Sequence, residues 1–400
     1  MKAIVLAAGQ GERLEPITHT RPKPFVPVLG KSLILRTIEH LTSLGIKEND
    51  IIVVGNENFR NYFESLPVSV VYQKEGKGTA SALRTVSGIR ADDLLIVYGD
   101  LYLERDAIKS VLDAGDNAIL GVKVPNPKEF GVLVTDSSNN LTAIVEKPEN
   151  PPSDLINGGV YRLDSDVFSY LDRVGVSPRG EMELTDAVTA MAREKKVKVV
   201  SYSGVWLDVS RPWHVIEINK HELDRVNGEI KGDLEHNVTI KGKVVIEEGA
   251  EVKAGTYIEG PAYIGKGASV GPNAYVRPYS VLLENSKVGA SVEIKESVIM
   301  EDAKVPHLSY VGDSVICEHV NLGAGTLIAN LRFDEQPVKV NVKGKRESSG
   351  RKKLGAFIGG YAKTGINVTI LPGVKIGAYA WIYPGSIVDR DVGKGEFYRR

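Results

Sequence analysis

The chain has 400 residues, with 50 Lys and Arg against 51 Asp and Glu, which gives a formal net charge of -1 at pH 7. That length allows two or three domains of about 150 residues each. The balanced charge argues against general binding to nucleic acid or to an anionic membrane surface. Cys317 is the one cysteine, so an internal disulfide is excluded. No apolar run approaches the roughly 18 residues of a membrane span, and the first residues lack a signal-peptide pattern, so we expect a cytoplasmic protein.

Short β-branched runs alternate with helix-like stretches over about the first 228 residues. The runs at 2–6, 51–54, 68–72 and 94–98 read as strands, and 33–44 is one of the helix-like stretches between them. This alternation predicts βαβ units and a mostly parallel sheet. A polar stretch then separates this region from a sequence of different pattern, so we place one domain at 1–228 and another at 229–400.

The second region carries an aliphatic residue every six positions. The series comprises Ile240, Ile246, Val252, Ile258, Ile264, Val270, Val276, Leu282, Val288 and Ile294. One hexad can supply a short strand and a turn, so the period predicts a parallel β-helix with three flat faces per coil. The pattern stops after about Ile299 and resumes at Ile358. For the repeats alone, a solenoid that serves only for trimerisation is the alternative.

A glycine-rich loop follows the first strand. Gly9 and Gly11 let backbone N–H groups approach a phosphate, and Arg13 and Lys23 add fixed positive charge. The third glycine of a dinucleotide fingerprint is missing, and no Gly-Lys-Ser/Thr follows as in a Walker A loop. Taken alone, the two glycines could equally form an ordinary tight turn.

Carboxylates lie at the ends of several later strands. Asp100 follows the apolar run 94–98, Glu146 and Lys147 end another run, and Asp208 follows Trp206 and Leu207. Open α/β sheets bind ligands at the carboxyl ends of their strands. Two aspartates beside phosphate-binding cations suit Mg²⁺-assisted phosphoryl chemistry, because Mg²⁺ takes one or two carboxylates and keeps several waters.

With these motifs, residues 1 to about 228 resemble the sugar-1-phosphate nucleotidylyltransferases, and the resemblance implies a Rossmann-like nucleotidyltransferase domain. One departure is Glu12, where this family usually has Thr or Ser. The family's reaction is an in-line attack of a sugar phosphate oxygen on the nucleotide α-phosphorus, with pyrophosphate leaving. The resemblance implies that Asp100 and Asp208 hold Mg²⁺ and that Arg13 and Lys23 stabilise phosphate charge as catalytic residues. It further implies nucleotide contacts from Leu6, Ala8, Gly9, Gly11, Gln73, Gly78 and Thr79, and sugar-phosphate contacts from Tyr98, Gly131, Glu146, Lys147 and Asn157.

A second constellation lies where the hexads stop. His307 and Tyr310 fall on an irregular coil, where an imidazole that titrates near neutral pH can act as a general base. A lone His is also commonly structural. Arg277 and Lys295 each follow an inward aliphatic position, so both should project outward and could grip a phosphate. The basic run 339–353 is either a solvated face or an attractor for the phosphates of coenzyme A.

The second region resembles the left-handed β-helix acetyltransferases, and most closely the acetyltransferase half of the bifunctional enzymes that make UDP-N-acetylglucosamine. The resemblance is carried by the stretch 307–313, by 321–326 and by Asn330. It implies that His307 takes the proton of the 2-amino group of an amino-sugar-1-phosphate as that group attacks acetyl-CoA. The Ala324 N–H would face the developing oxyanion. The implied amino-sugar-phosphate contacts are Arg277, Lys295, Tyr310, Asn321, Asn330 and Lys339, and the implied acetyl-CoA contacts are Ala324, Gly360 and Tyr383.

Our leading hypothesis is a bifunctional enzyme that acetylates glucosamine-1-phosphate or galactosamine-1-phosphate and transfers a nucleotidyl group from UTP or dTTP to a sugar-1-phosphate. The first alternative is a single-function glucose-1-phosphate thymidylyl- or uridylyltransferase, or a mannose-1-phosphate guanylyltransferase, with a β-helix used only for assembly. The second is a non-catalytic assembly subunit, against which the intact Asp100, Lys147 and Asp208 argue. We expect a homotrimer through the β-helix, with small-molecule substrates and no nucleic-acid or membrane partner.

Overall fold

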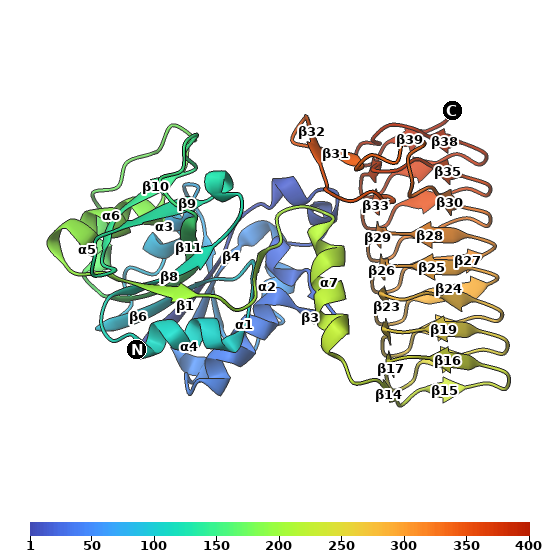
Figure 1. Ribbon diagram of the computed structural model, residues 1–400, viewed down its shortest axis with the longest axis horizontal. Coiled ribbons are helices and arrows are strands. Elements are labelled where there is room, and N and C mark those ends of the chain that lie inside the picture. Colours follow the sequence, from blue (N-terminus) through green and yellow to red (C-terminus); the bar gives the residue numbers. More distant parts are fainter. The chain divides into compact units, whose positions relative to one another are not determined.

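The computed structural model describes residues 1–400, which form two units that are not consecutive halves of the chain (Figure 1). The first unit comprises Met1–Gln10, Pro22–Phe25 and Ser32–Asp208, and the second comprises Gly11–Arg21, Val26–Lys31 and Val209–Arg400. Two short N-terminal segments therefore belong with the C-terminal unit. The sequence boundary at 228 stays a prediction.

The first unit is built on a nine-stranded sheet with the path β10-β9-β11-β6-β1-β4-β5, and β8 and β12 continue it from β11. Strands β6, β1, β4 and β5 are parallel, whereas β11 runs antiparallel to β6. Leu6 pairs with both Val54 and Tyr98, so the carboxyl ends of β1, β4 and β6 meet at one edge. The strands are β1 (Lys2–Ala7), β4 (Ile51–Asn56), β5 (Ser69–Gln73), β6 (Asp93–Tyr98), β8 (Ala118–Lys123), β9 (Gly131–Thr135), β10 (Leu141–Glu146), β11 (Leu155–Asp164) and β12 (Lys198–Tyr202), with the separate pair β7 (Leu101–Leu103) and β13 (Trp206–Asp208).

Helices cover both faces of this sheet. Ile38 of α1 and Ile108 of α4 pack with Val5 and Val53 on one face. Leu83 of α3 packs with Ile4 on the other face, together with α5 and α6. The alternation of β1 side chains between the two cores is the period of two that a strand dictates. The helices are α1 (Leu33–Ser43), α2 (Arg60–Phe63), α3 (Thr79–Arg84), α4 (Arg105–Asp113), α5 (Val167–Leu171) and α6 (Leu184–Glu194), with 3-10 turns η3 (Lys23–Phe25), η4 (Glu48–Asp50), η5 (Glu57–Phe59) and η6 (Pro127–Glu129).

The second unit is a left-handed parallel β-helix with three sheets (Figure 1). The hexads predict the parallel β-helix with three faces, and the resemblance to the acetyltransferases implies its hand. The first sheet contains β14 (Glu229–Ile230), β17 (Val244–Ile246), β20 (Ala262–Ile264), β23 (Ser280–Leu282), β26 (Val298–Ile299), β29 (Val315–Ile316), β33 (Phe357–Ile358) and β36 (Lys375–Ile376). The second contains β15 (Asp233–Leu234), β18 (Glu251–Val252), β21 (Ser269–Val270), β24 (Lys287–Ala290) and β27 (Lys304–His307), and bridges at Asn321 link it to β34 (Lys363–Thr364), β37 (Trp381–Ile382) and β39 (Phe397–Tyr398). The third contains β16 (Thr239–Lys241), β19 (Tyr257–Glu259), β22 (Tyr275–Val276), β25 (Glu293–Lys295), β28 (Tyr310–Gly312), β30 (Leu327–Ile328), β35 (Thr369–Ile370) and β38 (Ile387–Val388).

The coils continue through the region where the hexad pattern stops. Val276, Ile294, Val311 and Ile328 stack in register inside the helix. The spacing between inward residues is five rather than six at two places, from Ile294 to Ile299 and from Val311 to Ile316, so shortened turns hide the period. The second cause is an insertion at 329–356 that carries the hairpin β31 (Lys339–Val342) and β32 (Lys345–Ser348).

Helix α7 (His214–Arg225) packs against β26 within the second unit. Its Asn219 is 1% exposed and donates from Nδ2 to the Pro27 carbonyl at 3.1 Å, while its Oδ1 accepts from the Leu29 N–H at 2.9 Å. These bonds explain why Val26–Lys31 belongs to this unit. The same unit contains η1 (Glu12–Leu14), η2 (Ile17–His19) and β2 (Pro27–Val28). The strand β3 (Lys31–Ser32) spans a boundary in the sequence, because Lys31 belongs to the second unit and Ser32 to the first. No helix combines the length and apolar character that a bilayer crossing requires.

Candidate active sites

The carboxyl end of β6 places a carboxylate beside β1. The Gly99 N–H donates to the Leu6 carbonyl at 2.9 Å. A Cβ at Gly99 would lie 2.8 Å from Val5 Cγ1, so only glycine allows this close approach. Asp100 therefore lies directly beyond the edge of the parallel strands, which is where open α/β sheets bind ligands.

Two predicted metal ligands converge on one predicted phosphate ligand. Lys23 Nζ lies 2.8 Å from Asp100 Oδ2 and 2.8 Å from Asp208 Oδ1. Asp208 reaches this point because β13 pairs with β7, which sets Asp208 opposite Leu101. Burial alone would lower the pKa of Lys23, but the charges of Asp100 and then Asp208 outweigh burial and raise its pKa above the ordinary value. Lys23 therefore keeps its positive charge at neutral pH.

The same carboxylates form a donor set that fits a hard divalent cation. Mg²⁺ accepts one or two carboxylates when water fills its other positions. The Asp100 side chain is 32% exposed, so water can reach it, whereas Asp208 is 12% exposed. No group of three or more His, Cys, Asp or Glu side chains forms a metal cluster anywhere in residues 1–400. A metal at this edge would therefore depend on these two aspartates and on water or substrate oxygens.

A buried hydroxyl network lies next to the sheet edge. Tyr98 Oη is 3.0 Å from Tyr161 Oη, and Asn157 Nδ2 donates to Tyr161 Oη at 2.5 Å. Thr79 Oγ1 accepts from the Leu184 N–H at 2.9 Å and also bonds to Tyr98. Burial raises the pKa of Tyr98 to about 12, so its hydroxyl stays protonated and can donate. The structure thus brings three predicted substrate contacts together, namely Thr79, Tyr98 and Asn157.

Glu146 and Gly131 are register partners on β10 and β9. A Cβ at Gly131 would lie 2.8 Å from Glu146 Oε2, so the glycine leaves room for the carboxylate. Lys147 Nζ is 3.8 Å and Arg179 Nη1 is 3.5 Å from Glu146 Oε1, and Thr185 Oγ1 is 3.4 Å from Glu146 Oε2. The group combines a carboxylate, which can accept sugar hydroxyls, with two cations that can bind phosphate.

The other predicted nucleotide contacts are distributed along the chain as follows. Ala8 follows β1, and its carbonyl accepts from Asn56 Nδ2 at 3.3 Å. Gln73 ends β5 and donates to the Gly76 carbonyl at 3.0 Å. Gly78, with φ of 98°, is the N-cap residue of α3, and a Cβ added at Gly9 would meet no atom within 4 Å. Gly11 and Arg13 belong to the second unit, where Arg13 lies in η1.

The outer face of the third β-helix sheet gathers four residues predicted to bind an amino-sugar phosphate: Arg277, Lys295, Tyr310 and Asn330. Val311 points into the core, so its neighbours Tyr310 and Gly312 face outward. Asn330 Nδ2 donates to Tyr310 Oη at 3.0 Å above Gly312, where a Cβ would lie 2.5 Å from that oxygen. Burial raises the pKa of Tyr310, so its hydroxyl stays protonated.

Asp313 is the centre of this cluster and is 1% exposed. Lys295 Nζ lies 2.9 Å and 3.0 Å from its two oxygens, and Asn330 Nδ2 donates to Oδ2 at 2.5 Å. Arg351 Nη2 lies 3.3 Å from Asp313 Oδ1 and 2.8 Å from Glu296 Oε1. The carboxylate thereby fixes the two cations and the amide of the face.

His307 and Ala324 occupy equivalent corners of successive coils. Each precedes a residue with positive φ, Leu308 at 47° and Gly325 at 73°. The Gly325 N–H donates to the His307 carbonyl at 3.2 Å, so the two corners stack. His307 is exposed and lies between the second and third sheets, at the margin of the outer face just described.

The remaining predicted contacts divide between corners. Tyr383 lies at the same corner as Ala324 but two coils further on, and Asn321 lies in the second sheet. Gly360 lies at the opposite corner, between β33 and β34, where a Cβ would lie 2.6 Å from Thr20 Oγ1 and 2.7 Å from Glu318 Oε1. Within one chain the structure does not bring Gly360 to Ala324. Lys339 begins the hairpin strand β31 and is exposed.

Four side chains at these clusters were not among the predicted site residues: Tyr161, Arg179, Asp313 and Arg351. Asp313 is the last residue of the stretch 307–313 that carries the resemblance, so its place within the motif was a usable signal. Arg351 was concealed in a basic run, and its ion pairs depend on the path of the insertion. Tyr161 and Arg179 had no local signal, because strand pairing and a loop after α5 bring them to the site.

We expect Asp313→Asn to lower the free energy of unfolding by about 3 kcal/mol, because it leaves Lys295 and Arg351 with less compensating charge in a poorly hydrated cluster. Chemical denaturation followed by circular dichroism would measure this change. Asp334→Asn is the matched control, since it removes an exposed ion pair with Arg332 and should change stability by less than about 1 kcal/mol. Equal effects of the two variants would contradict a central role for Asp313.

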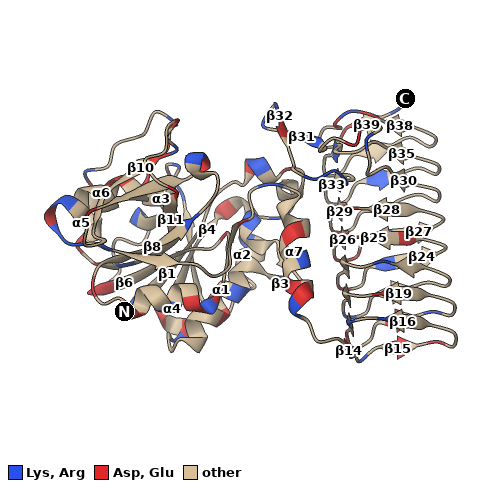
Figure 2. Ribbon diagram, viewed as in Figure 1, with Lys and Arg blue, Asp and Glu red and all other residues tan.

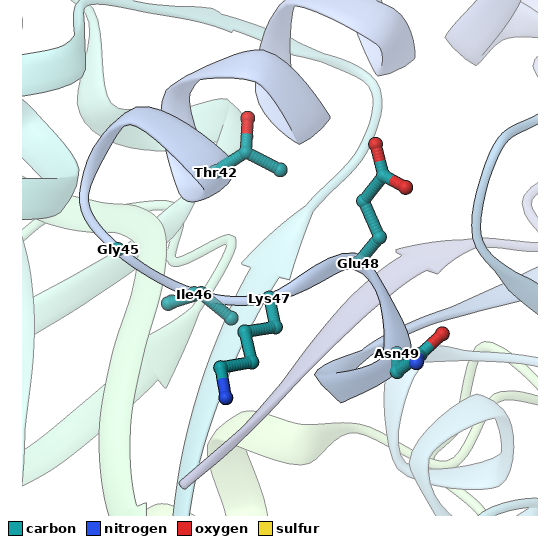
Figure 3. A pocket seen from close by; sticks show the side chains of 6 residues that line it. All are labelled: Thr42, Gly45, Ile46, Lys47, Glu48 and Asn49. Carbon is teal, nitrogen blue, oxygen red and sulfur yellow. The ribbon is translucent and has the colours of Figure 1, made fainter.

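A separate surface hollow of about 470 Å³ lies on the first unit (Figure 3). Its lining residues are Thr42, Gly45, Ile46, Lys47, Glu48 and Asn49. They precede β4, so they lie at the amino ends of the parallel strands, opposite the edge that carries Asp100. The hollow is therefore distinct from the sites described above.

Family models match both regions of the chain: a nucleotidyl transferase model covers residues 2–225, and a model of the GMPPB C-terminal domain covers residues 258–345. The fold and the matches to these two family models together define a nucleotidyltransferase that carries a left-handed β-helix. A bifunctional sugar-1-phosphate nucleotidylyltransferase/acetyltransferase of Sulfurisphaera tokodaii is 61% identical over 100% of both chains. The bifunctional protein GlmU of Methanocaldococcus jannaschii is 48% identical over 100% of this chain and 98% of its own.

A solved structure from Bacillus anthracis, assigned as a glucose-1-phosphate thymidylyltransferase, is 28% identical, covers 57% of this chain and 98% of that chain, and superposes with a TM-score of 0.50. The chain belongs to the family of bifunctional sugar-1-phosphate nucleotidylyltransferase/acetyltransferases. The predicted fold class and the predicted enzyme family are confirmed.

Proposed function

We propose that the chain acetylates glucosamine-1-phosphate or galactosamine-1-phosphate with acetyl-CoA and transfers a nucleotidyl group from UTP or dTTP to a sugar-1-phosphate. The observation that carries the proposal is that one chain holds both clusters: Lys23 between Asp100 and Asp208, and His307 beside the outer face of the third sheet. The full-length relatives named for both activities support it.

For nucleotidylyl transfer, we propose that Asp100 and Asp208 hold a divalent cation, which would neutralise phosphate charge when bound. Lys23 and Arg13 bind the phosphates of the nucleotide. Tyr98, Glu146, Lys147 and Asn157 hold the sugar phosphate so that its oxygen attacks the α-phosphorus as pyrophosphate leaves. The Gly9 region, Gln73, Gly78 and Thr79 surround the nucleotide. Positioning and electrostatics carry the rate, because no covalent intermediate is required.

For acetyl transfer, we propose that Arg277, Lys295, Tyr310 and Asn330 hold the amino-sugar phosphate on the outer face. His307 accepts a proton from the 2-amino group as the nitrogen attacks the acetyl carbonyl. The carbon–sulfur bond then breaks, and His307 passes this proton to the sulfur, so that coenzyme A leaves as its thiol. The Ala324 N–H faces the oxyanion. Asn321, Lys339, Gly360 and Tyr383 stay predictions as substrate contacts. Gly360 faces Thr20 and Glu318 within the chain, so a role for it requires a contact at a corner of the β-helix other than that of Ala324.

The division into domains 1–228 and 229–400 and the cytoplasmic location also stay predictions. A homotrimer is supported by large apolar side chains that stay exposed on the later coils. They include Leu308 at 66%, Ile366 at 56%, Trp381 at 57% and Phe397 at 59%. Light scattering that returned the mass of one chain, 43.5 kDa, would contradict the trimer.

Two assays on the purified full chain test the proposed function. Release of pyrophosphate from UTP and dTTP is measured with N-acetylglucosamine-1-phosphate, and release of free thiol from acetyl-CoA is measured with glucosamine-1-phosphate and galactosamine-1-phosphate. We expect turnover in both assays. Pyrophosphate release without thiol release from either amino sugar would instead favour the single-function alternative, in which the β-helix serves only assembly.

A further inference from the structure

The insertion at 329–356 carries a basic hairpin whose role the two proposed activities leave open. Strands β31 and β32 pair antiparallel, with Lys339 opposite Ser348 and Val342 opposite Lys345. Figure 2 shows Lys and Arg on this hairpin, in blue. Val338, Val340 and Val342 are buried in alternation with the more exposed Lys339, Asn341 and Lys343, so the hairpin has one packed face. The hairpin is therefore a paired and packed element of the structure, not an irregular surface loop.

Ion pairs and hydrogen bonds hold the hairpin in place. Arg211 is 6% exposed, and its Nε lies 2.6 Å from Oε2 of Glu347 on β32. Ser349 Oγ donates to the Val338 carbonyl at 2.7 Å and closes the base of the hairpin. Arg351 then ties the end of β32 to the β-helix through Glu296. The direction of the hairpin tip is therefore fixed.

The tip carries Lys343 and Gly344, which have φ of 49° and 79°. Two successive positive φ values are typical of the tight two-residue turn of a hairpin. Lys343 Nζ lies 2.6 Å from Glu12 Oε2. The hairpin of the β-helix thus contacts the glycine-rich loop of the nucleotidyltransferase motif.

Glu12 places a carboxylate in this loop. Gly11 has φ of 67° and begins η1, and its carbonyl accepts from Thr18 Oγ1 at 2.9 Å, so the backbone of this loop is well defined. Glu12 is the first residue of η1 and adjoins Arg13, which the proposed function assigns to nucleotide phosphate. A carboxylate in such a loop repels a triphosphate unless a cation compensates its charge.

We propose that Lys343 is a positioning residue for nucleotide binding, which compensates the charge of Glu12 and holds η1 in place from the tip of the β31–β32 hairpin. This inference rests on the proposed nucleotidylyl transfer and adds to it a residue from the other half of the chain. Within the basic run, Lys343 accordingly serves the nucleotide site, whereas Arg351 belongs to the cluster around Asp313.

The test is a double-mutant cycle in the full-length protein. We expect Lys343→Ala to raise the KM for the Mg²⁺ complex of UTP, or of dTTP if that is the better substrate, by about fivefold, as the loss of one exposed charge pair allows. The kcat should stay within about twofold. Lys343→Arg should keep the KM of the unaltered protein. The double variant Glu12→Gln with Lys343→Ala should recover most of the loss, because no carboxylate is left to compensate.

Arg332→Ala is the matched control. It breaks an exposed ion pair in the same insertion, in which Arg332 Nη2 lies 2.6 Å from Asp334 Oδ2, and it should leave the KM unchanged. An unchanged KM in Lys343→Ala, or a double variant as impaired as the single one, overturns the inference. A raised KM for acetyl-CoA alone would overturn it too and assign the hairpin to coenzyme A. If the unaltered protein releases no pyrophosphate, the proposed function itself fails, and the two failures are thereby distinguished.

Discussion

Asp208→Asn is expected to reduce nucleotidylyl transfer by about three orders of magnitude while acetyl transfer continues. Asp208 Oδ1 lies 2.8 Å from Lys23 Nζ, and its side chain is only 12% exposed. The substitution therefore removes one of the two carboxylates that could hold a divalent cation and also weakens the electrostatic hold on Lys23. Pyrophosphate release at saturating Mg²⁺ measures the loss.

The matched control is Asp154→Asn, which alters an exposed aspartate 3.6 Å from Lys123 and should leave both activities unchanged. Thermal melts of both variants would separate loss of activity from loss of fold. If Asp208→Asn kept more than about a tenth of the activity, a metal-binding role for Asp208 would be untenable.

His307→Ala is expected to reduce acetyl transfer by at least about a hundredfold, with nucleotidylyl transfer intact, because general-base catalysis contributes about 10² to 10⁴ in rate. His307 is exposed at the corner that stacks on the Ala324 coil, so its loss should disturb no packed core. Thiol release from acetyl-CoA with the preferred amino-sugar-1-phosphate provides the measurement.

His319→Ala is the control for this experiment. His319 lies at the opposite corner of the β-helix, where its ring stacks on Tyr361 with a centroid distance of 4.7 Å. Loss of acetyl transfer in both variants would indicate a general effect on the β-helix, and loss in neither would leave His307 as a structural histidine.

The sequence was most informative where a structural period is local. The hexads predicted the β-helix because each inward residue reports its own coil, and the strand ends predicted that Asp100 and Asp208 lie near one another. The shortened turns from Ile294 to Ile299 and from Val311 to Ile316 concealed coils that are present. One missing residue moves every later position out of phase with a period of six, although the pairing of strands is unaffected.

Contacts that depend on long-range chain paths could not be predicted from the pattern. The pairing of Arg351 with Asp313 and of Lys343 with Glu12 depends on how the insertion at 329–356 folds back. No periodicity encodes that path. The same is true of the segment Gly11–Arg21, which follows the first strand but belongs to the second unit.

Because Gly11–Arg21 belongs to the second unit, the two activities are difficult to separate by cutting the chain or by losing part of the gene. Arg21 is 7% exposed and lies 2.6 Å from Glu301 Oε2 and 3.4 Å from Glu318 Oε2, both on the β-helix. A chain cut after residue 228 would take both carboxylates away from a buried guanidinium in the loop that follows the nucleotide motif. The first half therefore cannot be released by a single cut without damage to its own loop, and a gene that loses the β-helix must replace these contacts before its first activity can survive alone.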